Sequence, residues 1–202
     1  MSFDAEVLKM DIAVIGTGFI GRTLGKGLAE AGHNVTFGSR HPDHDDIASD
    51  SPATVASVGQ ALESAEVVIL ALPGSAVGEL ASEHEHALAT KVVIDATNRT
   101  DRPVANSRDV LPAGARYARA FNTLGGENIA NPVFDEGLAD MFFSSEEADR
   151  STIETVIEGV GLRPIYVGPN EEDLIDSLFR LWIALAVKQG RGRRLALRLL
   201  EH

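Results

Sequence analysis

The chain of 202 residues contains no cysteine and only one tryptophan and two tyrosines. Without cysteine, disulfide bonds, thiolate metal sites and cysteine nucleophiles are excluded. No stretch is long and apolar enough to cross a bilayer, and residues 1–9 lack the pattern of a signal peptide. We therefore expect a cytoplasmic protein with no membrane segment. Residues 200–202 resemble the start of a histidine tag and are left out of the functional reasoning.

Positive charge is scarce, because 18 Lys and Arg residues face 30 Asp and Glu residues and the formal net charge is −12. This balance argues against nucleic acid and anionic membranes as partners. Any phosphate site must be built locally, from helix N-termini and single arginines. The sequence also lacks a Ser-His-Asp order, a paired-carboxylate motif and H-E-x-x-H, and no metal site is predicted.

The strongest positive signal is an apolar strand at residues 11–15 that runs directly into a complete G-x-G-x-x-G motif. The motif and its intervening positions are Gly16, Thr17, Gly18, Phe19, Ile20 and Gly21. In a dinucleotide-binding unit the first glycine permits a tight turn, the second lets the pyrophosphate approach the backbone, and the third lets helix pack on strand. The alternative is a Rossmann domain that has lost its nucleotide.

The end of the second predicted strand indicates which dinucleotide binds. An Asp or Glu there usually holds the ribose 2′-hydroxyl of NAD, but this strand leads into Gly38, Ser39 and Arg40. A hydroxyl and a planar guanidinium suit a 2′-phosphate, so the pattern favours NADP(H). The alternative interpretation of Arg40 is an ordinary surface arginine that pairs with Asp43. Arg22 lies either near the phosphates or in solvent.

Strands and helices alternate along most of the chain, which predicts an α/β fold of the doubly wound Rossmann type with a mostly parallel sheet. We assign residues 1–168 to an NADP-binding Rossmann domain and 169–202 to a small helical C-terminal lobe. The predicted strands are 11–15, 35–38, 53–56, 67–72, 91–95, 116–121, 140–144 and 163–167. The predicted helices are 19–31, 58–64, 75–88, a short one after 126, 146–159, 171–187 and 191–200.

The helix predicted at 171–187 carries apolar residues at helical spacing, namely Leu174, Leu178, Leu181, Trp182 and Leu185. Trp182 is interpreted as core or dimer interface, with a stacking platform as the alternative. The arginines that follow bind an anionic substrate tail, pair with the many acidic residues or cover a dimer interface; they are Arg191, Arg193, Arg194 and Arg198.

Ligands of open α/β sheets bind at the carboxyl ends of the strands. This rule nominates Leu72 and Pro73 for contact with the nicotinamide ribose or ring, and Thr97, Asn98 and Asn122 beside them. Each asparagine is alternatively a turn former. No Lys or His falls at these ends. Reduction of a carbonyl usually needs a proton relay, whereas hydride transfer between two redox rings needs mainly positioning.

The chain resembles the NADPH-dependent reductases of the deazaflavin coenzyme F420. The opening G-T-G-x-I-G-x-x-L-x-x-x-L-x-x-x-G-H-x-V-x-x-G-S-R carries the likeness, together with residues 68–73, 94–98, 120–124, 181–186 and 190–192. The resemblance implies a dimer and hydride transfer between NADPH and a deazaflavin bound over the nicotinamide. It places Thr17, Ser39 and Arg40 at the NADP phosphates and Pro73 at the nicotinamide. The position that is often basic four residues after Arg40 is His44 here.

Three hypotheses follow. The first is an NADP(H)-dependent oxidoreductase that passes a hydride to coenzyme F420 or a flavin. The second is an NADPH-dependent reductase of a small carbonyl or imine, with an acid still to be found. The third is a non-catalytic NADPH sensor.

Overall fold

The computed structural model describes residues 9–44, 47, 51–98 and 107–200. Its centre is an eight-stranded sheet with the order β10-β9-β6-β5-β4-β1-β2-β3. The strands are β1 (Asp11–Ile15), β2 (Asn34–Ser39), β3 (Thr54–Ser57), β4 (Val67–Leu70), β5 (Val92–Asp95), β6 (Arg116–Arg119), β9 (Asp140–Ser145) and β10 (Arg163–Tyr166). Neighbouring strands are parallel except for β6 and β9, where Ala118 pairs with Ser145 in an antiparallel register. The run from β3 to β6 has the doubly wound Rossmann order, as predicted.

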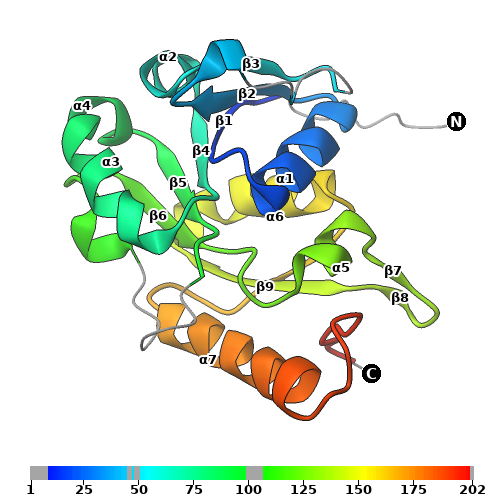
Figure 1. Ribbon diagram of the computed structural model, residues 1–202. Coiled ribbons are helices and arrows are strands. Elements are labelled where there is room, and N and C mark those ends of the chain that lie inside the picture. The colour runs from blue at the N-terminus through cyan, green and yellow to red at the C-terminus, as the bar shows by residue number, and fades with distance from the viewer. Residues whose placement is uncertain (1–8, 45–46, 48–50, 99–106, 201–202) are drawn as a thin grey trace, which may run out of the picture.

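Helices cover both faces of this sheet (Figure 1). They are α1 (Phe19–Glu30), α2 (Val58–Ser64), α3 (Val77–Glu83), α4 (Glu85–Leu88), α5 (Gly126–Ala130), α6 (Arg150–Gly159) and α7 (Glu172–Ile183). Side chains of β1 alternate between two apolar layers, because successive residues of a strand point to opposite faces. Ile12 and Val14 join the layer under α1 and α6, and Ala13 and Ile15 join the layer under α2 and α3.

Two details of the middle region differ from the sequence prediction. The helix expected at 75–88 begins as a 3-10 turn at Gly74–Ala76 and is divided into α3 and α4 at His84, whose φ and ψ of −120° and 31° are not helical. A small hairpin of β7 (Val133–Phe134) and β8 (Gly137–Leu138), which was not predicted, precedes β9.

The C-terminal segment corrects a second prediction. The π-helical turn Ala184–Lys188 extends α7, but residues 191–200 are not the helix that was expected. Gly190 and Gly192 have φ values of 67° and 88°, which end the helical path. The Leu195 carbonyl is used in tertiary contacts instead, because it accepts hydrogen bonds from Trp182 Nε1 at 2.7 Å and Asn128 Nδ2 at 2.9 Å.

The apolar stripe of α7 is only partly buried. The residues that face the protein are Ile175, Phe179, Trp182 and Ala186. Trp182 is therefore a core residue, which was the favoured interpretation. The neighbouring Leu174 and Leu181 are each 44% exposed. None of the helices in the described part of the chain has the length and apolarity that crossing a bilayer requires.

Candidate functional site

The glycine motif forms the turn between β1 and α1, and two of its glycines are demanded by the packing of the chain itself. Gly16 has a φ of +117°, and a Cβ there would lie 2.3 Å from the Ala71 carbonyl oxygen just beyond β4. A Cβ on Gly21 would lie 1.9 Å from the Gly16 oxygen. These contacts agree with the tight turn and the close packing that the sequence predicted for these positions.

Gly18 differs from its two neighbours in the motif. Its φ is −76°, which any residue adopts, and a Cβ there would meet nothing within 4 Å. The fold itself therefore does not explain a glycine at this position. Gly18 is the N-cap of α1, which has no side-chain cap and no acidic residue in its first turn. The free N–H groups and the positive end of the helix dipole thus face an open space, which suits a pyrophosphate.

The turn that contains the glycine motif is contacted by Arg22 of α1, and the residues that follow the turn pack against Gly126 of α5. Arg22 Nε donates to the Thr17 carbonyl oxygen at 2.8 Å, so this arginine folds back over the turn. Phe19 is 60% exposed, although its ring is close enough to Gly126 that a Cβ there would lie 2.6 Å from it. Ile20 lies against the same glycine. The N-terminus of α1 therefore meets the N-terminus of α5.

At the end of β2, Ser39 is buried and Arg40 is exposed. The Ser39 hydroxyl accepts a hydrogen bond from the backbone N–H of His41 at 3.0 Å, which shapes the turn that carries Arg40. The side chain of His44, and Asp45 and Asp46 altogether, lie outside the described residues.

The other predicted residues lie at the ends of β4, β5 and β6, the strands next to β1 on its other side. Leu72 is half-buried, Pro73 and Asn98 are exposed, and Thr97 and Asn122 are buried. The two asparagines do come together, with Asn122 Nδ2 3.4 Å from Asn98 Oδ1 and Asn98 Nδ2 3.4 Å from the Asn122 carbonyl oxygen.

All the predicted site residues therefore lie along one edge of the sheet. The line runs from Asn122 at the end of β6, past β5, β4 and the glycine turn after β1, to Arg40 after β2. Four strand spacings of about 4.8 Å make roughly 19 Å, which is a suitable length for an extended dinucleotide.

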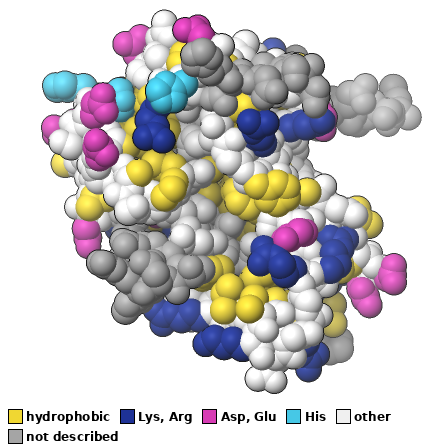
Figure 2. All heavy atoms as spheres, viewed as in Figure 1, with side chains coloured by type: hydrophobic (Ala, Val, Ile, Leu, Met, Phe, Trp, Pro, Cys, Tyr) yellow, Lys and Arg dark blue, Asp and Glu magenta, His cyan; other side chains and the backbone are white. Residues whose placement is uncertain are grey.

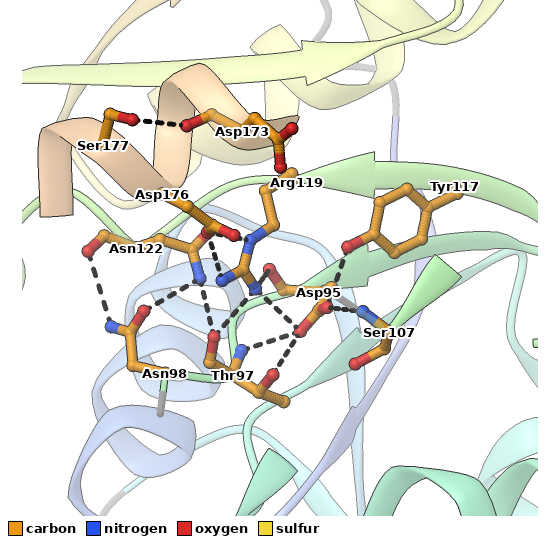
Figure 3. A network of polar contacts seen from close by, with 10 residues as sticks. All are labelled: Asp95, Thr97, Asn98, Ser107, Tyr117, Arg119, Asn122, Asp173, Asp176 and Ser177. Atoms are coloured by element: carbon orange, nitrogen blue, oxygen red, sulfur yellow. Dashed lines mark hydrogen bonds and ion pairs between the residues drawn. The ribbon is translucent and has the colours of Figure 1, made fainter. Parts of the chain in front are cut away.

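The strand ends also contain a buried polar network that sequence reasoning missed (Figure 3). Arg119 is completely buried between Asp95 of β5 and Asp176 of α7, with N–O distances of 3.1 and 2.7 Å. Burial alone would lower the pKa of Arg119, but Asp95, Tyr117 and Asp176 outweigh it and the pKa is raised. Tyr117 donates to Asp95 at 2.8 Å, and burial together with this carboxylate raises the pKa of the phenol.

Phe121, beside this network, is one of two non-glycine residues with positive φ in the described part of the chain, at 66°. Such a conformation costs of order 1–3 kcal/mol in a non-glycine residue and persists where the surroundings impose it. The strain lies at the residue immediately before Asn122, where the sequence predicted a ligand contact.

Two of the C-terminal arginines have partners within the protein. Arg193 pairs with Glu127 at 2.6 Å and lies over the Trp182 ring at 5.4 Å. Arg194 donates to Asn128 Oδ1 at 3.2 Å and to backbone carbonyl groups of Asn131 and Val133. Arg193 therefore pairs with an acidic residue, as one interpretation expected, whereas these partners of Arg194 are amide and carbonyl oxygens.

The fold and the glycine turn define a Rossmann-type protein with the turn of a dinucleotide-binding unit. Residues 11–99 match the model of the family described as NADP oxidoreductase, coenzyme F420-dependent. The match confirms the resemblance seen in the sequence.

Individual curated proteins are also similar to the chain. Glycerol-3-phosphate dehydrogenase [NAD(P)+] of Pseudomonas syringae pv. tomato is 26% identical over 154 residues, which are 68% of this chain and 45% of the relative. 2-Hydroxy-3-oxopropionate reductase of Escherichia coli is 24% identical over 172 residues, which are 80% of this chain and 56% of the relative. The chain thus spans about half the length of these curated relatives.

Among solved structures, a candidate F420-dependent NADP reductase from Arthrobacter sp. FB24 superposes with a TM-score of 0.79 and 23% identity. The superposition covers 95% of this chain and 100% of the other. A likeness at this identity establishes the shared fold.

Proposed function

We propose that this protein binds NADP(H) along the sheet edge and transfers a hydride between NADPH and a redox ring, either the deazaflavin coenzyme F420 or a flavin. The observation that carries the proposal is the open space over Gly18 in front of the uncapped N-terminus of α1. Gly16 and Gly21 are needed for folding, but Gly18 is explained by a ligand that approaches the backbone.

The preference for NADP(H) over NAD(H) rests on Ser39 and Arg40. Neither position offers the carboxylate that would hold a ribose 2′-hydroxyl and repel a 2′-phosphate. The exposed Arg40 guanidinium is free of burial cost and provides a planar pair of donors for the phosphate. It supplies positive charge locally in a chain whose formal net charge is −12.

The proposed acceptor follows from the composition of the strand ends. Residues 72–76, 96–98 and 120–126 contain no Asp, Glu, His, Lys or Tyr, so they offer no general acid. Phe19, Leu72 and Pro73 present apolar surface instead, and Figure 2 shows hydrophobic side chains gathered across the middle of this face. NADPH supplies the hydride when bound, and these residues would orient a flat partner and exclude water from it.

Anaerobic mixing with NADPH tests this proposal, with absorbance followed first with coenzyme F420 and then with FMN as the acceptor. Rapid turnover with coenzyme F420 and little with FMN is expected. Tight NADPH binding with no turnover of either ring would refute ring-to-ring transfer. It would favour a small-carbonyl or imine reductase, or an NADPH sensor, and a panel of small carbonyls and imines then separates these two.

We also propose a homodimer through α7. A stripe of four leucines follows α7 and the π-helical turn after it, with Leu174 and Leu181 exposed and Leu178 and Leu185 half-buried. Their spacings of four, three and four residues are the same in both chain directions. A two-fold axis would therefore place Leu178 against Leu181 of a second copy, and such self-complementarity suits an isologous interface.

Sedimentation velocity tests the dimer, with Leu181→Glu as the disrupting variant. The matched control is Glu158→Gln on the opposite side of the fold. A monomeric wild-type protein would contradict the proposal. The cytoplasmic location and the domain boundary at residue 168 remain predictions.

A further inference from the structure

Arg119 joins three segments of the chain through a guanidinium that no solvent reaches. Its Nε and Nη2 both donate to Asp176 Oδ1 of α7, at 3.0 and 2.7 Å. Its Nη1 donates to the Thr97 carbonyl oxygen at 2.8 Å, directly after β5. The same carbonyl oxygen accepts from Asn122 Nδ2 at 3.0 Å. One side chain thus connects α7 to the backbone that presents Asn98 and Asn122 (Figure 3).

The two carboxyl groups that face Arg119 are not equivalent. Asp95 accepts hydrogen bonds from Thr97 N, Thr97 Oγ1, Ser107 N and Tyr117 OH at 2.7–2.9 Å, in addition to the ion pair with Arg119. Both of its oxygens are surrounded by donors, an arrangement that suits a carboxylate. Asp176 uses Oδ1 alone, and its Oδ2 is buried without a partner.

The charges follow from this difference. One guanidinium balances one carboxylate, and Asp95 has the donors that a carboxylate requires. A second buried negative charge on Asp176, with one bare oxygen, would be uncompensated. Burial raises the pKa of Asp176, Asp95 and Asp173 add to the rise, and Arg119 opposes it. A proton on Oδ2 removes the uncompensated charge.

A second contact from α7 reaches the same strand end. A Cβ on Gly125 would lie 2.8 Å from the ring of Trp182, so the loop after Asn122 lies directly on this tryptophan. The Asn122 Oδ1 atom is itself buried without a hydrogen-bond partner, and Phe121 before it has the strained φ. α7 therefore contacts the chain before and after Asn122, through Asp176 at Arg119 and through Trp182 at Gly125.

We propose that Arg119 and Asp176 are positioning residues through which α7 sets the geometry of the strand ends at the nicotinamide end of the site. The residues that they position are Thr97, Asn98 and Asn122, and Asp176 acts as a neutral acid. The inference rests on the proposed function, because that function places the nicotinamide at these strand ends. The role is indirect, because Arg119 and Asp176 are both buried and neither can touch a ligand in the cleft.

The test compares Arg119→Lys, Asp176→Asn and Asp176→Ala with the wild type. Arg116→Lys is the matched control, because Arg116 lies on the same strand and also pairs with an aspartate, Asp149, but is 52% exposed and lies at the opposite end of β6. Five quantities are measured: Kd for NADPH, the fluorescence of the bound reduced nicotinamide, kcat and KM with coenzyme F420, and Tm without ligands.

Lysine has no planar fork and cannot hold Asp176 and Thr97 together. We expect Arg119→Lys to lower kcat by about tenfold or more and to change the fluorescence of the bound nicotinamide. Its Kd for NADPH should stay within about threefold of the wild-type value, since the phosphates bind elsewhere.

Asparagine keeps an oxygen for Arg119 without a charge, so the kcat of Asp176→Asn should match that of the wild type within about twofold. Asp176→Ala should instead behave like Arg119→Lys.

Two results would overturn the inference. Unchanged nicotinamide fluorescence and kcat in both Arg119→Lys and Asp176→Ala would remove the positioning role. Equal damage in Asp176→Asn and Asp176→Ala, including a lower Tm in both, would show that a charged Asp176 is required. If the wild-type protein binds NADPH without turnover, the proposed hydride transfer is refuted but the positioning role is not. The comparison of bound nicotinamide fluorescence between the wild type and the variants then tests the positioning role by itself.

Discussion

The substitution Gly18→Ala separates nucleotide binding from folding. The new methyl group would meet no atom of the protein within 4 Å, and the φ of −76° suits alanine. Alanine is a poorer N-cap than glycine, but it also restricts the unfolded chain, so the net stability change should stay within about 0.5 kcal/mol. For a domain of this size that is a Tm shift of roughly 2 °C or less.

The effect on binding should be much larger. The methyl group would occupy the space over the N-terminus of α1 and hold the pyrophosphate away from the backbone N–H groups. Loss of one hydrogen bond to a charged group costs about 1.5–3 kcal/mol, which raises Kd for NADPH roughly 10- to 150-fold. Fluorescence titration with NADPH and thermal unfolding of the same samples measure the two quantities.

Gly21→Ala is the matched control for this experiment. Its Cβ would lie 1.9 Å from the Gly16 carbonyl oxygen, so the turn and α1 must move apart. Overpacking of this kind costs about 1–3 kcal/mol, and Tm should fall by roughly 2–12 °C. If Gly18→Ala binds NADPH like the wild type, or loses as much stability as Gly21→Ala, the reasoning from open space at Gly18 is wrong.

Three further variants test other parts of the account. Arg40→Ala should raise Kd for NADPH about tenfold or more with little change for NADH, and equal losses for both would refute the 2′-phosphate role. Burial lowers the pKa of His33, so as pH falls the His33 imidazole is protonated in the unfolded chain before it is protonated in the folded chain. The free energy of unfolding should therefore decrease as pH drops below about 6.5. In unfolding experiments at several pH values, His33→Gln should reduce this dependence of stability on pH. The raised pKa of Asp176, caused mainly by burial, means that the folded chain keeps a proton that the unfolded chain releases. Asp176→Asn should therefore gain stability relative to the wild type as pH rises above about 4, and a constant difference between the two would contradict the neutral acid.

The sequence was sufficient to predict the Rossmann half because its signals are local. The apolar run at Val67–Leu70 reads as a buried parallel strand on its own, and the glycine motif reports contacts within a few residues of itself. The order of β1 to β6 then follows from the few ways in which such units connect.

The failures involve partners that are distant in the sequence. Arg119 lies between two alanines in a predicted strand, and nothing nearby indicates that its partners Asp95 and Asp176 are 24 and 57 residues away. An arginine in a short apolar strand was the available signal, because such a residue is rarely buried without a partner.

The same reason explains the C-terminal errors. The leucines and arginines of 191–200 have helical spacing, but hydrogen bonds to Asn128 and Trp182 hold that segment in another path. Along α7 two neighbouring faces are apolar, and the spacing alone did not reveal that the face of Ile175 and Phe179 is the buried one.

Transfer of a deuterium label tests the central claim most directly. NADPH carrying deuterium at both C4 positions of the nicotinamide is mixed anaerobically with the protein and coenzyme F420, and the reduced deazaflavin is analysed by mass spectrometry. A deazaflavin retains a hydride on carbon, so direct transfer predicts one deuterium in the product, with the accompanying proton taken from solvent. Reduced deazaflavin without the label, or no reduced deazaflavin although NADPH is bound, would contradict hydride transfer between the two rings.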